Sequence, residues 1–324
     1  MATKSFQWAS SISAAASTDI IDARSPSEFA EDHVPGAINL PVLNDAERAQ
    51  IGTLHKHDSF AARKQGAALI SRNIAAMLEG PLQSKSGDFF PTIYCWRGGM
   101  RSQSLGIILA QVGFRAAVLE GGYKRYRHQV IDTLNHLGAS LDVRILAGLT
   151  GTAKTAILHR MTERGFQVID LEGLANHKGS LLGAPMGSTQ PTQKTFESLL
   201  AATMDQLDPT RPVWVECESN KIGALHTPEA LWKTMQAARV VEITAPVESR
   251  VHYLLRDYEY FCAHPAALKE KVRCLLRVRG HEVVNRWCEL IDAERWTTFV
   301  EEILVQHYDP TYGRSIERWR QRGD

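Results

Sequence analysis

A mostly apolar run that enters a glycine-rich loop and then a helix limits the folds open to this chain more than any other feature. The run is Val143-Arg-Ile-Leu-Ala147, the loop is Gly148-Leu-Thr-Gly-Thr-Ala-Lys-Thr155, and a helical pattern continues to Arg164. A strand, a glycine-rich loop and a helix, in this order, are typical of a phosphate-binding loop. Such loops belong to parallel α/β sheets, so the sequence predicts this architecture for the second half of the chain.

The residues of this loop have the chemistry that a phosphate group requires. Backbone N–H groups can curl around the phosphate, the ammonium group of Lys154 can reach its oxygens, and the helix dipole adds attraction. One residue departs from the pattern, because Ala153 stands where glycine is expected before the lysine. A Cβ atom there narrows the backbone's options, which weakens the case for nucleotide binding but keeps the anion site. We predict that the phosphate-binding residues are Gly148, Thr150, Gly151, Lys154 and Thr155.

A second strand, loop and helix surround a cysteine. Residues 92–94 form an apolar run that delivers Cys95 to the end of a strand, and a helical apolar pattern begins beyond Arg101. A sulfur in this position faces backbone N–H groups and a helix N-terminus, and both favour a negative charge on it. We predict that Cys95, Arg97 and Arg101 are catalytic and that Gly98 and Gly99 let the loop curl around an anion. A buried structural cysteine is the weaker interpretation, because two arginines and two glycines share one short loop.

The length and composition indicate two domains in a soluble α/β protein. A chain of 324 residues is long for one core, and we expect domains at residues 1–138 and 139–324. Strands alternate with helices in both, which predicts parallel sheets, and the chain beyond Val247 is almost wholly helical and partly basic. Five scattered cysteines indicate a reducing compartment, and the absence of a long apolar run argues against a membrane span, so we expect a cytoplasmic protein. The net charge of +1 offers no overall argument for nucleic-acid binding.

Three separated motifs in the first half carry a resemblance. They are Asp22-x-Arg24 with Glu28-Phe29, then His33-Val-Pro-Gly-Ala-Ile-Asn-Leu-Pro41, and then Glu120-Gly-Gly-Tyr123. With Cys95 in its loop between them, these motifs resemble a rhodanese domain. The resemblance implies that Cys95 carries sulfur or selenium as a persulfide or perselenide. It also implies structural roles for Asp22 and Arg24 and a place beneath the loop for His33.

The spacing from Cys95 to Arg101 also occurs in cysteine-dependent phosphatases. Those enzymes commonly have a histidine before the cysteine, where this chain has Tyr94, and no acid for the leaving group is evident. A phosphatase is therefore the minor interpretation of this loop.

Further motifs extend the resemblance over nearly the whole chain. They are Tyr94-Cys-Trp-Arg-Gly-Gly-Met-Arg-Ser102, Asp170-Leu-Glu-Gly-Leu-Ala-Asn-His-Lys-Gly-Ser180, Gln190-Pro-Thr-Gln-Lys194 and Glu216-x-Glu-Ser219. With the rhodanese-like motifs and the phosphate-binding loop, they resemble the tRNA 2-selenouridine synthases. The resemblance implies that selenium from selenophosphate replaces sulfur in the 2-thiouridine at the tRNA wobble position. It also implies transfer of a geranyl group from geranyl diphosphate to that sulfur, without a tightly bound cofactor.

Two pairs of charged residues have further candidate roles in the second domain. The segment from Ala245 to Arg256 resembles the place where P-loop kinases keep phosphate-clamping arginines, so Arg250 and Arg256 are expected to bind phosphate. Glu216 and Glu218 end a predicted strand, where they either bind a metal ion or form caps and ion pairs. We expect no metal site.

Three other functions remain as alternatives. A rhodanese-type sulfurtransferase for a small-molecule acceptor would form thiocyanate from thiosulfate without RNA. A small-molecule kinase would bind ATP tightly, against which Ala153 argues. An RNA-binding regulator would keep its activity in a Cys95→Ser variant.

Overall fold

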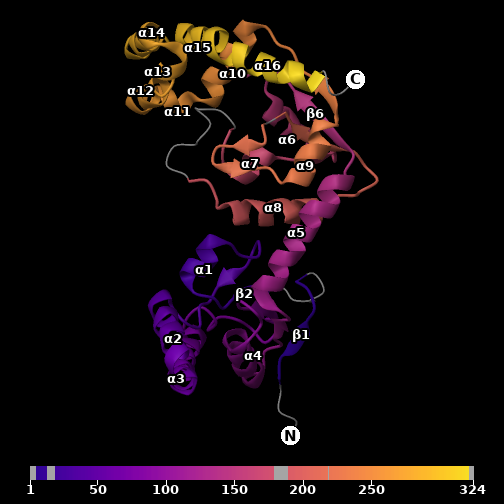
Figure 1. The fold of residues 1–324 in the computed structure, drawn as a ribbon, viewed down its shortest axis with the longest axis vertical. Helices are drawn as coiled ribbons and strands as arrows, with labels where there is room; N and C mark the ends of the chain where they lie inside the picture. Colours follow the sequence, from indigo (N-terminus) through magenta and orange to yellow (C-terminus); the bar gives the residue numbers. More distant parts are fainter. Residues whose placement is uncertain (1–4, 13–18, 179–188, 218, 321–324) are drawn as a thin grey trace. The chain divides into compact units, whose positions relative to one another are not determined.

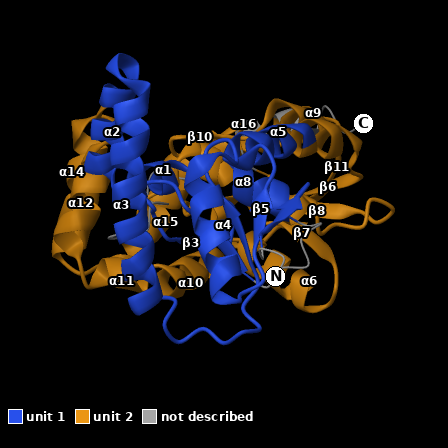
Figure 2. Cartoon of the chain, turned by 90° about the horizontal axis from the view of Figure 1, so that it is seen from below, with its two compact units in different colours: residues 1–132, 197–202 blue, residues 133–196, 203–324 orange. Residues whose placement is uncertain are grey.

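The computed structural model describes residues 5–12, 19–178, 189–217 and 219–320, and it divides into two compact units. Unit 1 contains Met1–Asp132 and Glu197–Ala202, and unit 2 contains Thr133–Phe196 and Thr203–Asp324 (Figure 2). Two helices, α5 (Gly122–Ser140) and α8 (Gln193–Met204), therefore contribute residues to both units.

Unit 1 is built on a five-stranded parallel sheet with the strand order β1-β5-β4-β2-β3. The strands are β1 (Gln7–Ala9), β2 (Asp19–Asp22), β3 (Ile38–Asn39), β4 (Pro91–Tyr94) and β5 (Ala117–Leu119). The helices are α1 (Pro26–Glu31), α2 (Asp45–His57), α3 (Ser59–Glu79), α4 (Met100–Val112) and the first part of α5 (Figure 1). The predicted parallel α/β architecture is confirmed.

Strand β4 lies between β5 and β2, and this central position explains its composition. All four of its residues are buried, and Ile93 is part of the apolar core beneath helices α3 and α4. An inner strand of a parallel sheet is covered on both faces, so it has no polar alternation. Its carboxyl end passes directly into the loop of Cys95, which is where α/β sheets bind their ligands.

Unit 2 contains a four-stranded parallel sheet with the order β11-β6-β8-β7. Its strands are β6 (Val143–Ala147), β7 (Gln167–Ile169), β8 (Val213–Glu216) and β11 (Arg239–Glu242). Helices α6 (Lys154–Glu163), α7 (Leu171–Ala175) and α9 (Glu229–Gln236) accompany it, as does a small antiparallel ribbon of β9 (Lys221–Ile222) and β10 (Leu225–His226). The strand, loop and helix predicted around the glycine-rich loop are β6, the loop and α6.

The chain beyond β11 is helical, as the sequence predicted. It comprises α10 (Val247–Asp257), α11 (Glu259–Cys262), α12 (Pro265–Arg273), α13 (Leu276–Arg279), α14 (His281–Asp292), α15 (Trp296–Ile303), the π-helix η1 (Leu304–Tyr308) and α16 (Asp309–Arg320). These helices share an apolar core around the fully buried Trp287. Among the described residues, no helix has both the length and the apolar character needed to cross a membrane.

Candidate active sites

Two glycines, one in the loop of Cys95 and one at the start of α5, have backbone conformations and close neighbours that glycine alone permits. Gly98 has a φ of +66°, and a Cβ atom there would lie 2.5 Å from the carbonyl oxygen of Leu119. Gly122 has a φ of +58°, and its Cβ atom would lie 2.2 Å from the carbonyl oxygen of Cys95. The backbone N–H of Tyr123 donates to the carbonyl oxygen of Cys95 at 2.8 Å, and that of Lys124 donates to the carbonyl oxygen of Trp96 at 3.0 Å. The start of α5 thus holds the cysteine loop in one conformation.

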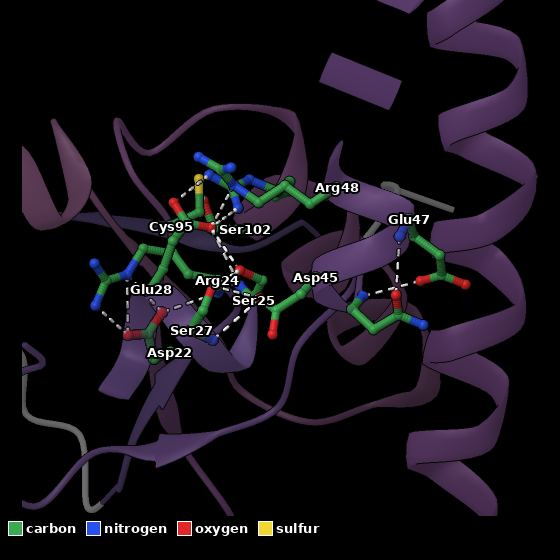
Figure 3. A network of polar contacts seen from close by, with 12 residues as sticks. Asp22, Arg24, Ser25, Ser27, Glu28, Asp45, Glu47, Arg48, Cys95 and Ser102 are labelled. Atoms are coloured by element: carbon green, nitrogen blue, oxygen red, sulfur yellow. Dashed lines mark hydrogen bonds and ion pairs between the residues drawn. The ribbon is translucent and has the colours of Figure 1, made fainter. Parts of the chain in front are cut away.

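The sulfur of Cys95 lies at the base of this loop and has a hydroxyl neighbour. Cys95 is buried, and the hydroxyl of the fully buried Ser102 lies 3.2 Å from its Sγ atom (Figure 3). The same hydroxyl lies 3.1 Å from the carbonyl oxygen of Gly99, which is itself 3.8 Å from the sulfur. The Ser102 hydroxyl can therefore donate a hydrogen bond to a negatively charged sulfur, or to the carbonyl oxygen of Gly99 when the sulfur carries its own proton. Sequence analysis did not single out Ser102, although it directly follows Arg101.

Arg101 is held beside the loop by a carboxylate from α1. Its guanidinium donates to Glu28 at 2.8 Å, and Arg48 approaches the same carboxylate at 2.8 Å (Figure 3 shows Glu28 and Arg48). Burial alone would raise the pKa of the Glu28 carboxyl, but the hydrogen bond and charge of Arg101 outweigh it and lower that pKa. Arg97 is exposed, as is Trp96 beside it. The two predicted catalytic arginines therefore differ, one fixed by an ion pair and one in solvent.

Three other residues of the motifs in the first half, Asp22, Arg24 and His33, make contacts within unit 1. Asp22 and Arg24 form a fully buried ion pair, and the guanidinium also donates to the carbonyl of Asp32 at 2.6 Å. This arrangement agrees with structural roles for both. His33 stacks on the ring of Phe29 at 3.8 Å, and its Nδ1 lies 2.9 Å from the Phe29 carbonyl oxygen. Its ring stacking and its hydrogen bond are thus with helix α1.

The phosphate-binding loop has the strongly curved backbone that its glycines predict. Gly148 and Gly151 have φ angles of +157° and +87°. Ala153 also lies in the left-handed region, with φ 61° and ψ 28°, and it is the N-cap of α6. An L-residue in this conformation is strained by about 1–2 kcal/mol. The loop therefore keeps the shape of a glycine loop despite the methyl group.

A polar cavity of about 230 Å³ is lined by Thr150, Gly151, Lys154 and Thr155 together with charged residues from other elements. The ammonium group of Lys154 lies 3.4 Å from Glu216, and the Thr155 hydroxyl donates to the same carboxylate at 2.9 Å. Lys178 also lines this cavity and pairs with Asp257 at 2.6 Å. Lys178 belongs to the segment 170–180 that resembles the family, but the sequence alone indicated no role for it. The cavity thus offers two lysines to an anionic ligand.

The structure does not bring Arg250 or Arg256 to this cavity. Arg250 is 2% exposed, and its guanidinium makes a bidentate ion pair with Asp309 at 2.9–3.2 Å. Arg256 is exposed, and its guanidinium lies 5.7 Å from the ring centroid of Tyr253. Arg250 therefore joins α10 to α16 through a buried ion pair. Phosphate binding by Arg250 and Arg256 stays a prediction.

One of the two carboxylates predicted at the end of β8, Glu216, has partners other than a metal ion. Glu216 pairs with Lys154 and Thr155, whereas Glu218 lies outside the described residues. Over the described parts of the chain, no three His, Cys, Asp or Glu side chains are grouped as ligands for a metal ion.

A second cavity lies beside the phosphate-binding loop, and its walls are apolar. Its lining includes Leu254, Tyr258, Phe261, Leu268 and Phe299, and Thr150 of the loop is also part of it. Thr150, Leu254 and Tyr258 line both cavities.

Two family models and several named proteins are similar to this chain. A family model of the rhodanese-like domain matches residues 5–129, and a model of the tRNA 2-selenouridine synthase AAA domain matches residues 141–273. A tRNA 2-selenouridine synthase from Nitrosomonas europaea is 35% identical over 94% of this chain and 91% of its own. Proteins of the same name from Alcanivorax borkumensis (32% identity, 93% and 90% covered) and Pseudomonas syringae pv. syringae (35%, 92% and 88%) are similar to it as well. The chain therefore belongs to the tRNA 2-selenouridine synthase family.

Proposed function

We propose that this protein replaces the sulfur of wobble 2-thiouridine in tRNA with selenium from selenophosphate, by way of an S-geranylated intermediate. The observation that supports this most is the presence, in one chain, of a buried cysteine in a loop shaped by glycines and of a phosphate-binding loop whose cavity is lined by two lysines. The first can provide a nucleophile and the second can bind a diphosphate. Both are needed to exchange one chalcogen for another at a carbon atom.

The first step turns the sulfur into a leaving group. The thiocarbonyl sulfur attacks C1 of geranyl diphosphate, the C–O bond breaks, and the proton of N3 is lost to water. Diphosphate departs with its charge neutralised by Lys154 and Lys178, aided by the backbone N–H groups of the loop. This role needs no nucleotide hydrolysis, so it tolerates Ala153 in the loop.

The second step exchanges chalcogens at C2 of the base. The Cys95 thiolate attacks C2 and expels geranylthiolate, which leaves the base bound to the cysteine through sulfur. Selenium of selenophosphate then attacks C2, the Cys95–C2 bond breaks, and water cleaves the P–Se bond to release phosphate and 2-selenouridine. No oxidant is consumed. The alternative route forms a perselenide on Cys95. Selenium in selenophosphate is at the oxidation level of selenide, and its release as phosphate changes no oxidation state. Forming the S–Se bond of a perselenide removes two electrons, so that route requires an added oxidant.

Mass spectrometry of wobble nucleosides tests this proposal. Thiouridine-containing tRNA is incubated with selenophosphate and geranyl diphosphate, without oxidant, beside Cys95→Ser and Lys154→Ala variants of confirmed folded state. We expect selenouridine from the unaltered protein, geranylthiouridine from Cys95→Ser, and unchanged thiouridine from Lys154→Ala. Lys154→Ala should still convert tRNA that was geranylated beforehand.

Three outcomes would contradict parts of the proposal. Full selenation by Cys95→Ser with loss of geranylation would overturn the division of roles between the two loops. A strict requirement for an oxidant would favour the perselenide route. Unchanged thiouridine with every protein, together with thiocyanate formed from thiosulfate, would identify a small-molecule sulfurtransferase instead.

A further inference from the structure

The apolar cavity beside the phosphate-binding loop is an unusual feature of a helical core. Natural cores pack with few voids larger than a water molecule. Here about 60 Å³ stays open to the centre of a water-sized sphere, within the same set of helices that packs around Trp287. On that measure one water needs roughly 10–15 Å³, so the cavity accepts a group of several heavy atoms. Its walls offer almost no polar atoms, and an apolar cavity of this kind favours hydrocarbon over water.

The position of the cavity defines the kind of ligand. Thr150, Leu254 and Tyr258 line it and also line the polar cavity of Lys154 and Lys178. The polar cavity is lined by these two lysines and by Glu172, Glu216 and Asp257. A molecule that fills both cavities therefore carries an anionic group that can replace the carboxylates at the lysines, and a hydrocarbon chain at its other end. A nucleotide does not fit this description, because the edge of its base needs hydrogen-bond partners that these walls do not provide.

We infer that the apolar cavity binds the hydrocarbon chain of a prenyl diphosphate and limits the length of chain that is transferred. The inference rests on the proposed prenyl transfer. The lining residues that the two cavities share mark the side of the apolar cavity next to the loop. Leu254 and Tyr258 are half-buried and lie next to the loop, whereas Phe261, Leu268 and Phe299 are almost fully buried. The chain therefore enters past the first two and ends against the last three.

Cavity size is the property to change in a test. Leu268→Ala and Phe299→Ala enlarge the inner part, and Leu268→Phe fills it. Leu290→Ala is the matched control, because Leu290 is equally buried in the same helical core but does not line the cavity. Each protein receives thiouridine-containing tRNA and an equal mixture of geranyl and farnesyl diphosphates. The products are counted by mass spectrometry, and binding of inorganic diphosphate is measured by calorimetry.

We expect the two enlarging variants to raise the ratio of farnesylated to geranylated product by roughly tenfold or more, since each apolar group in a pocket discriminates on this scale. Leu268→Phe should lose geranyl transfer while still binding inorganic diphosphate, and Leu290→Ala should keep the original ratio. An unchanged ratio in both enlarging variants, with normal geranylation by the unaltered protein, would overturn the inference alone. Absence of prenyl transfer by the unaltered protein would overturn the proposed function together with it. Direct binding of ATP that is tighter than that of inorganic diphosphate in the unaltered protein and in Leu290→Ala, but not in Leu268→Phe, would assign the cavity to a nucleotide base and also overturn the inference.

Discussion

The buried ion pair between Arg250 and Asp309 gives a prediction with a magnitude. A Leu side chain at position 309 would remove the carboxylate and leave the guanidinium of Arg250 buried without its partner. Breaking such a pair destabilises a protein by about 3–5 kcal/mol. Because the Asp309 side chain is 24% exposed and water can reach it, we expect the lower end, about 3 kcal/mol. For a unit of this size, this lowers the Tm by about 6–12 °C.

The double variant Arg250→Met/Asp309→Leu separates a structural role from a phosphate-binding role. Replacing both partners by apolar residues removes the unpaired charge, so most of the lost stability should return. We also expect the double variant to bind inorganic diphosphate as the unaltered protein does, because the guanidinium faces Asp309 rather than the polar cavity. Thermal unfolding and calorimetric titration with diphosphate measure the two effects independently.

Two results would refute this reasoning. If the double variant is as unstable as Asp309→Leu, the loss does not come from an uncompensated charge. If the double variant recovers its stability but no longer binds diphosphate, Arg250 is the phosphate clamp that the sequence indicated.

Three further predictions concern the cysteine loop. Ser102→Ala should slow alkylation of Cys95 by iodoacetamide about tenfold at neutral pH, since it removes a hydrogen bond to the charged sulfur; a rate equal to that of the control Ser104→Ala would contradict this. Glu28→Gln should lower the free energy of unfolding by about 1–3 kcal/mol at neutral pH. The pKa of Glu28 is lowered in the folded state, so the difference in unfolding free energy should be complete above pH 4.5, the ordinary pKa of this carboxyl. It should vanish as the pH falls through the lowered pKa of the folded state. A difference that grows in acid would be inconsistent with the ion pair. Gly122→Ala should abolish selenation and destabilise unit 1 by more than Gly36→Ala does. The control Gly36 also has a positive φ, which costs alanine roughly 1–2 kcal/mol, but it has open space around its Cβ position. Equal unfolding free energies of the two variants would show that the Cys95 loop can move away from the added methyl group.

The sequence was sufficient for features that local patterns determine. Strands β4 and β6, their loops and the helices that follow were predicted within one or two residues, because buried parallel strands are continuous apolar runs and glycine-rich loops need particular backbone angles. Local side chains also determine where helices α2 and α3 begin, because Asn44 and Asp58 cap them.

What the sequence did not reveal depends on residues far apart in the chain. Arg250 lies in the segment where the sequence predicts a phosphate-binding arginine, but Asp309, with which its guanidinium forms an ion pair, is 59 positions away in the chain. The carboxylate that holds Arg101 is 73 positions before it. The edge strand β1 also escaped prediction, because its three residues lack a pattern of their own and pair with β5. In each case the tertiary fold, rather than local preference, selects the contact.

The ion pair between Lys154 and Glu216 has a consequence for how the phosphate-binding loop is filled and emptied. The loop already contains an internal counter-anion, so every ligand must exchange with Glu216 before it reaches the ammonium group. This competition lowers the affinity for all anions by the same free energy, and only those with the strongest attraction to the loop stay bound at a given concentration. In the proposed prenyl transfer this carboxylate would also assist turnover, because it can return to Lys154 and Thr155 and displace the diphosphate that remains.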